Sequence, residues 1–105
     1  MGAPLRKLTV LCPKEIEAVM ADALDALEPR LPGYTVLDAQ GRGANLQPVT
    51  AGERVRGARR MAMFVLVLPE ARVADVTEAI RIACPRPQIA YWTEPVEDFG
   101  RLTDA

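Results

Sequence analysis

The stretch from Arg59 to Pro69, RRMAMFVLVLP, constrains the fold of this chain most. Its centre, residues 61–68, is an unbroken apolar run with the length of a strand, too short for an isolated helix. Side chains alternate between the two faces of a strand, and here both alternating sets are apolar. We therefore predict a strand that needs apolar cover on both of its faces.

The rest of the chain shows the spacings of three further strands and two helices. Short apolar segments typical of strands cover residues 5–12, 34–40 and 89–96, and helical spacing runs from Pro13 to Pro29 and from Pro69 to Pro85. Each helix is expected to carry its first proline in the first turn, and Pro95 favours an edge position for the last strand. The order β-α-β-β-α-β predicts an α+β, ferredoxin-like fold, with a four-stranded antiparallel sheet of spatial order 4-1-3-2 and both helices on one face.

We expect a single domain over residues 1–105, with a long flexible loop over 41–57 and a short tail over 97–105. The loop holds four glycines and shows no sustained period, and connections of this length are usually functional or disordered. The tail is expected to pack through Phe99 and Leu102.

This topology leaves one face of the sheet without helices, and the third strand makes that face apolar. Monomers rarely expose an apolar patch of more than a few hundred square ångströms. We therefore predict that copies of the chain pack these faces together in a cyclic assembly, with Trp92 as an interface anchor. The alternative is that the loop or the tail folds over the face.

Composition excludes several classes of function. The chain contains no histidine and no serine, so Ser-His-Asp and Cys-His catalysis are impossible and an enzyme is the weakest option. The net charge of −1 and the single aromatic on the third strand, Phe64, disfavour a nucleic-acid partner. No apolar run has the length of a membrane span, and the first residues lack a signal-peptide core, so we expect a cytoplasmic protein without direct membrane insertion.

The long loop is the first candidate site. From Gly41 to Arg60 the chain carries five arginines and one glutamate, a net charge of +4. Glycines let a backbone approach a ligand, and guanidinium groups bind carboxylate or phosphate through two hydrogen bonds. The alternative is a solvated loop whose arginines only keep it soluble. Ligand or partner contacts are predicted for Gln40, Gly41, Arg42, Gly43, Arg54, Arg56, Arg59, Arg86 and Arg101.

The two cysteines form the second candidate site. In the predicted topology Cys12 ends the first strand and Cys84 ends the second helix, so both lie at the same end of the domain as the loop. They are candidate ligands for a soft metal ion or a redox pair. The alternative is that each is a small buried hydrophobe, because two thiolates alone underfill a tetrahedral site unless subunits share it.

Three segments of the sequence resemble the PII signal-protein superfamily. VLDAQGRG, residues 36–43, resembles the lead-in to the PII loop, and MFVLVLPEARVADVTEAI, residues 63–80, resembles the PII passage from strand through proline to helix. GERVRGARR, residues 52–60, and above all IAYWTEPVEDFGRL, residues 89–102, resemble a small proteobacterial PII-like family encoded near heavy-metal efflux pumps of the resistance-nodulation-division type. The chain resembles the copper-tolerance protein CutA more distantly.

The resemblance implies a homotrimer with a regulatory rather than catalytic role. PII proteins bind ATP or ADP between subunits through a turn after the second helix. In this chain the turn is short and lacks glycine. Arg86 and Arg101 are the residues of these segments that can bind an anion. The loop has no tyrosine or serine for PII-type modification.

Our leading hypothesis from the sequence is a trimeric PII-like regulator that controls a membrane transporter through the basic loop, and the resemblance makes a heavy-metal efflux pump the first candidate transporter. The rival is a sensor that binds an adenine nucleotide or a soft metal ion at the subunit interface, near Cys12, Cys84 and the loop.

Overall fold

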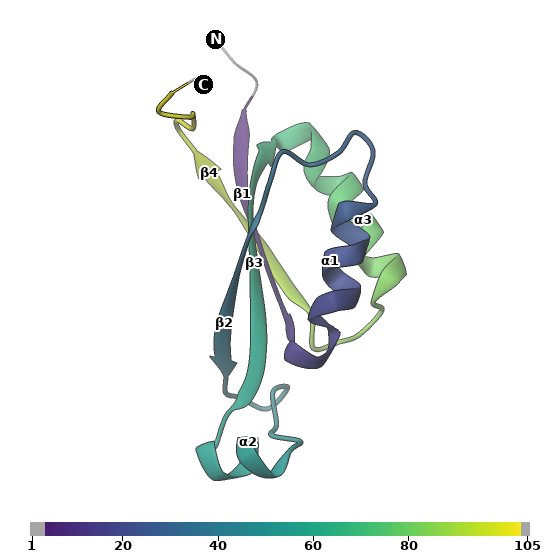
Figure 1. The fold of residues 1–105 in the computed structure, drawn as a ribbon, viewed down its shortest axis with the longest axis vertical. Helices are drawn as coiled ribbons and strands as arrows, with labels where there is room; N and C mark the ends of the chain where they lie inside the picture. The colour runs from purple at the N-terminus through teal and green to yellow at the C-terminus, as the bar shows by residue number, and fades with distance from the viewer. Residues whose placement is uncertain (1–3, 104–105) are drawn as a thin grey trace.

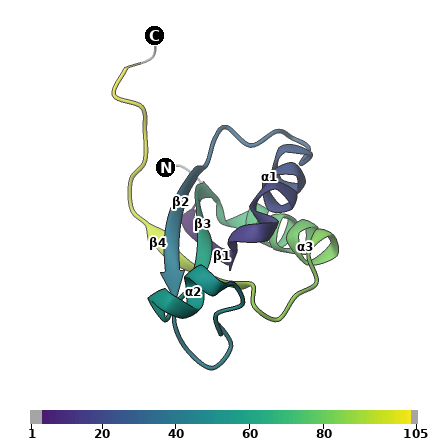
Figure 2. The same ribbon diagram turned by 60° about the horizontal axis from the view of Figure 1, so that its bottom comes forward.

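The computed structural model describes residues 4–103. Four strands form one antiparallel sheet in the order β2-β3-β1-β4, which confirms the predicted fold class and strand order. Helices α1 and α3 lie side by side on one face of this sheet, while α2 lies beyond its end (Figures 1 and 2). The elements are β1 (Leu5–Pro13), η1 (Lys14–Ile16), α1 (Glu17–Asp25), β2 (Thr35–Gly41), α2 (Ala51–Arg56), β3 (Arg59–Pro69), η2 (Glu70–Arg72), α3 (Val73–Ala83) and β4 (Ala90–Val96).

Two prolines mark the passages from strand to helix, and the prediction for them was wrong in detail. Pro13 and Pro69 are the last residues of β1 and β3 and precede a turn of 3₁₀ helix, rather than lying in the first turn of an α-helix. Their backbone angles are nearly identical, with φ and ψ of −57° and 142° at Pro13 and −58° and 139° at Pro69. The fixed φ of proline suits an extended residue as well as a helical one, and ψ decides between them.

The core lies between the sheet and the two helices. The even-numbered apolar side chains of β1 and β3 face the helices and are buried, as the alternation predicts. Phe64 is completely buried at the centre, with the ring of Tyr34 centred 5.8 Å from its own. The buried core residues are Leu8, Val10, Cys12, Ile16, Met20, Leu24, Ala62, Phe64, Leu66, Leu68, Val76, Ile80 and Cys84.

The opposite face of the sheet carries no helix of the part of the chain that the structure describes. Met63 pairs with Leu11 on one side and with Leu37 on the other, so three apolar side chains share this open face. Leu37 is 46% exposed, and Trp92, opposite Thr9 on the same face, is 43% exposed. The predicted lack of helical cover is confirmed for this face.

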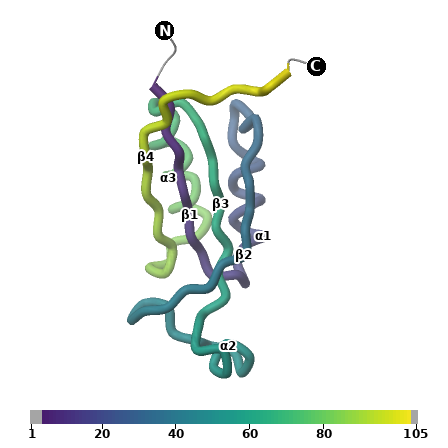
Figure 3. The backbone as a smooth tube through the Cα atoms, turned by 90° about the vertical axis from the view of Figure 1, so that its left-hand side faces the viewer, coloured from purple at the N-terminus to yellow at the C-terminus, as the bar shows by residue number. Residues whose placement is uncertain are grey.

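The tail after β4 does not pack as predicted. Leu102 is fully exposed and Phe99 is more than half exposed. The tail crosses the end of the sheet that lies away from α2 (Figure 3), where Phe99 borders a surface hollow with Val65 and Val67. Beyond Val96, which pairs with Leu5, the tail has no strand left to follow, so only its first apolar residue stays near the sheet.

Within residues 4–103, no helix combines the length and the apolar content that a bilayer span requires.

Candidate functional site

The loop, the end of β1 and the end of α3 share one end of the domain, as the connectivity predicts (Figure 1). Four residues of the loop line a surface hollow together with Pro87 and Gln88 from the turn after α3: Ala44, Asn45, Gln47 and Val49. The long connection therefore meets the turn after α3 instead of extending alone into solvent.

A short helix, α2, lies inside the segment that was predicted to be a flexible loop, residues 41–57. Thr50 accepts a hydrogen bond from the backbone N–H of Glu53, and the Glu53 carboxylate accepts one from the backbone N–H of Thr50, which is a complete capping box for α2. Gly57 ends the helix with φ of +73°, the left-handed conformation that favours glycine. Six residues are too few to display an apolar period, but Thr50, Glu53 and Gly57 at this spacing are a signal that could have located the helix.

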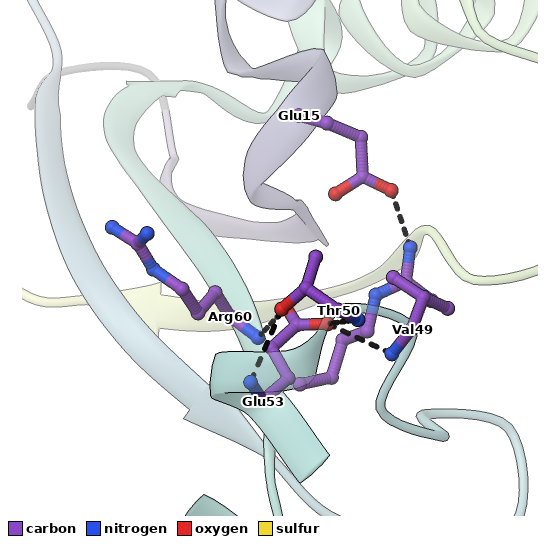
Figure 4. A network of polar contacts seen from close by, with 6 residues as sticks. Glu15, Val49, Thr50, Glu53 and Arg60 are labelled. Carbon is purple, nitrogen blue, oxygen red and sulfur yellow. Dashed lines mark hydrogen bonds and ion pairs between the residues drawn. The ribbon is translucent and has the colours of Figure 1, made fainter. Parts of the chain in front are cut away.

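Glu53 is the residue that holds the loop together (Figure 4). Its side chain is almost completely buried and accepts backbone hydrogen bonds from Val49 at 2.9 Å, Thr50 at 3.2 Å and Arg60 at 2.7 Å. The bonds from Val49 and Arg60 favour the charged carboxylate most and lower the pKa of Glu53 to about 2. Glu53 enters the sequence analysis above only as the one negative charge in the basic loop, and its role in holding α2 was not predicted.

The depressed pKa of Glu53 predicts an acid-sensitive loop. The pKa rises from about 2 in the folded chain to an ordinary value of 4.5 when α2 is unfolded, so the contribution of Glu53 is complete above pH 4.5. It is lost progressively as the pH falls through about 2. We expect the backbone resonances of Thr50 and Gly57 to titrate with a midpoint near pH 2, and Glu53→Gln to abolish that titration. A midpoint near 4.5 would show that the carboxylate is not held by these bonds.

Among residues 4–103, Arg59 is the only buried arginine. It is 7% exposed, and its Nη2 donates to the carboxylate of Glu15, which joins β3 to the beginning of the first helical segment (Figure 4). Its Nε–H is buried and has no acceptor among residues 4–103. Arg59 lines the hollow of about 360 Å³ already described, together with Ala44, Asn45, Gln47, Val49, Pro87 and Gln88. We call this space the Arg59 hollow.

Gly41, Gly43 and Gln40, which were predicted to contact a ligand, lie in three different environments. Gly41 is packed, because an added Cβ would lie 2.7 Å from the Cδ1 of Leu46, whereas Gly43 lies in open space with φ of +140°. Gln40 lines a separate hollow of about 270 Å³ with Lys14, Asp38 and two arginines, Arg56 and Arg60. Lys14 donates to the carboxylates of Glu17 and Asp38 there, and these bonds raise the pKa of Lys14 and lower that of Asp38.

The remaining predicted arginines lie in three different places. Arg42, Arg54 and Arg56 are exposed around α2, and the Nη1 of Arg42 comes within 3.7 Å of the position that a Cβ on Gly57 would take. Arg86 lies in the turn after α3 and borders a third hollow with Tyr91 and Cys84. Arg101 borders the hollow near Phe99 at the opposite end of the sheet, so the structure does not bring it to the loop within one chain.

The two cysteines lie near one another at the loop end, as the topology predicts. Both are free and buried, and burial, followed by the neighbouring Cys84, raises the pKa of Cys12 to about 11. A thiol in that state is a poor nucleophile. Among the residues described, no cluster of three or more His, Cys, Asp or Glu side chains is arranged to hold a metal ion. Metal binding by this pair stays a prediction.

Comparison with known proteins agrees with this fold. The sequence model of a family described as "Protein of unknown function (DUF3240)" matches residues 3–103. The crystal structure of a DUF3240 family protein from Shewanella baltica OS155 has a TM-score of 0.77 at 22% identity, covering 98% of this chain and 100% of that chain. No protein with a curated description matches the sequence.

Two further solved structures extend the likeness. CPII, a nitrogen regulatory PII-like protein from Thiomonas intermedia K12 solved with ADP, AMP and bicarbonate, has a TM-score of 0.68 at 20% identity, covering 93% of this chain and 94% of that chain. A Bacillus cereus protein related to NIF3 has a TM-score of 0.67 at 18% identity, covering 93% of this chain and 27% of that chain. At these identities the likeness establishes a PII-like fold.

Proposed function

The chain belongs to the DUF3240 family, and from its PII-like fold and the loop end of its sheet we propose that it is a non-catalytic, cytoplasmic regulator that acts as a homotrimer. Its partner is a membrane transporter, and residues 41–57 are the segment that docks on it. The observation that carries this proposal is the exposed surface of α2, a capped helix that projects from the end of the sheet (Figure 1).

The surface of α2 has the composition of a docking element. Val55 is 91% exposed, and Arg54 and Arg56 on either side of it are exposed as well. An isolated exposed valine is ordinary, but here it lies on a helix fixed by its own capping box and flanked by positive charge. A partner groove with an apolar pocket and an acidic rim would complement this surface, with the valine supplying binding energy and the arginines speeding the encounter. The resemblance to proteins encoded near heavy-metal efflux pumps makes a pump of the resistance-nodulation-division type the first partner to test.

Val55→Glu is expected to weaken docking on such a pump by about tenfold or more. The substitution removes an apolar contact and puts a negative charge against an acidic rim, and ~1.4 kcal/mol corresponds to a tenfold change in Kd. The measurement is interferometry with the purified protein and the pump in lipid nanodiscs. Ile82→Glu, at an exposed position on α3, is the matched control and should bind like the wild type. Equal binding by both variants, or none by the wild type, would rule out docking of α2 on this pump.

A second candidate function is a sensor of adenine nucleotides, which the likeness to nucleotide-bound CPII favours. The hollow beside α3 supports it in this chain, because the exposed ring of Tyr91 could stack on a base and Arg86 could meet a phosphate. A soft-metal sensor that uses Cys12 and Cys84 is the third reading. Sensing and docking are compatible, since a bound effector could alter the loop that docks.

A further inference from the structure

We propose that the basic tip of the domain, around α2, binds the headgroups of anionic lipids on a membrane surface. The basic tip consists of Arg42, Arg54, Val55, Arg56 and Arg60. It lies at one end of the longest extent of the domain, which is 50 Å (Figure 1). This inference rests on the proposed function, because a regulator of a membrane transporter has to reach the membrane, and it adds the lipid as a second partner beside the transporter.

The arginines of the basic tip carry charge that no acidic side chain neutralises. All four are exposed, and none of them forms an ion pair with a carboxylate of residues 4–103. Two acidic residues at this end of the domain are already bound. Glu53 is buried and accepts hydrogen bonds from three backbone N–H groups, and Asp38 accepts one from Lys14. The surface that the tip presents to a partner is therefore positive.

The positive charges surround α2 instead of lining one side of it. Arg54 and Arg56 are two residues apart on the helix, so their side chains leave it in nearly opposite directions, with Val55 between them. Arg42 lies at the end of the helix, where its Nη1 is 3.7 Å from the position that a Cβ on Gly57 would take. A flat anionic surface offers a negative partner to all of these side chains, whereas a single bound anion does not.

The charge of the chain is unevenly distributed between this end and the rest. Residues 41–60 carry +4 and the whole chain carries −1, so the rest of the chain carries −5. An anionic surface attracts the end that holds α2 and repels the remainder, which orients the domain with the basic tip toward the membrane. The small net charge of the whole chain hides this separation.

The composition of the basic tip favours lipid over nucleic acid. Val55 is 91% exposed, and an apolar side chain between two arginines can enter the headgroup layer while the guanidinium groups bind lipid phosphates. Residues 41–60 contain no aromatic side chain that could stack on a base. The contact is adsorption at the headgroups and needs no segment that crosses the bilayer.

A cyclic assembly would multiply this contact. A rotation axis carries every copy of the basic tip to the same level, so the three tips of the proposed homotrimer can meet one flat surface together. Each arginine near an anionic bilayer raises the affinity about fivefold, and linked tips bind far more tightly than a single one. Weak binding by one chain therefore becomes firm binding by the trimer.

The test is cosedimentation of the full-length protein with pump-free vesicles, made of phosphatidylcholine alone or of an equimolar mixture of phosphatidylcholine and phosphatidylserine. We expect the wild type to bind only the mixed vesicles, with an affinity that falls as salt is added. Arg54→Glu changes the charge of the basic tip by two units and should weaken binding by about tenfold or more. Arg30→Glu makes the same change in the connection before β2, at the end of the sheet away from α2, and should bind like the wild type.

Equal binding by Arg54→Glu and Arg30→Glu, or equal binding to the two kinds of vesicle, would overturn the inference. Tighter binding to a single-stranded RNA than to the mixed vesicles would assign the basic tip to nucleic acid instead. The pump in nanodiscs of phosphatidylcholine separates this inference from the proposed function. If the protein binds those nanodiscs but no vesicle, docking on the pump stands and the lipid contact is wrong. If it binds the mixed vesicles but not the pump, the lipid contact stands and docking on this pump is wrong.

Discussion

Met63→Glu is expected to dissociate the protein into single chains, with at least a hundredfold weaker self-association. Met63 lies at the centre of the open face, between Leu11 and Leu37 on the neighbouring strands. Assembly through this face would bury the new carboxylate without a partner, and an unpaired buried charge costs about 3–5 kcal/mol. Sedimentation velocity at micromolar concentration should show one third of the wild-type mass.

Ile82→Glu is the control for this experiment, because it places the same charge on the exposed side of α3. It should keep the wild-type mass. A wild-type protein that sediments as a single chain, or a Met63→Glu variant of unchanged mass, would contradict assembly through the open face. The tail does not replace a second subunit there, since Phe99 reaches only the hollow beside Val65 and Val67 and leaves Leu37 nearly half exposed.

The sheet could be predicted from the sequence because the residues of β3 are apolar on both faces, which is typical of a strand inside a sheet. An apolar run of strand length with no polar face has to lie in the interior of a sheet, and β3 pairs with β1 and β2 on its two sides. Pro95 correctly indicated that β4 is an edge strand, because proline cannot donate to a neighbour on both sides. Both features depend only on residues that are close together in the sequence, so they can be recognised without knowing the fold.

The loop could be predicted only in part, because its structure depends on contacts that spacing does not show. The charge count treated all arginines between residues 41 and 60 alike, yet Arg59 is buried and paired with Glu15, which lies 44 residues earlier in the chain. Glu53 was missed for the same reason, since one of the three backbone groups that it binds belongs to β3. The spacing of Thr50 and Glu53 in the capping box of α2 is the one part of this structure that the sequence could have indicated.

The tail and Arg101 show a different limit. Resemblance placed Arg101 among the anion-binding candidates, and within one chain it lies at the end of the sheet away from the loop. A residue of this kind can join a loop-end site only across a subunit boundary. The sequence holds no information on which surfaces of two copies meet, beyond the apolar character of the open face.

Phe64→Ala should have the largest effect on stability of any single truncation in this chain. Phe64 is completely buried between Val10 and Val36 on the neighbouring strands and packs on the ring of Tyr34. Removing such a ring costs about 3–5 kcal/mol, a large share of the roughly 5–15 kcal/mol that a domain has in total. Thermal unfolding at fixed protein concentration should show a midpoint lower by roughly 12 °C or more, because ~1 kcal/mol moves a domain of this size by about 4–8 °C. Ile82→Ala, a truncation at an exposed site, should change stability by no more than about 0.5 kcal/mol. If the two variants unfold at the same temperature, the core does not lie between the sheet and the helices, and the burial from which the open face was inferred would be wrong as well.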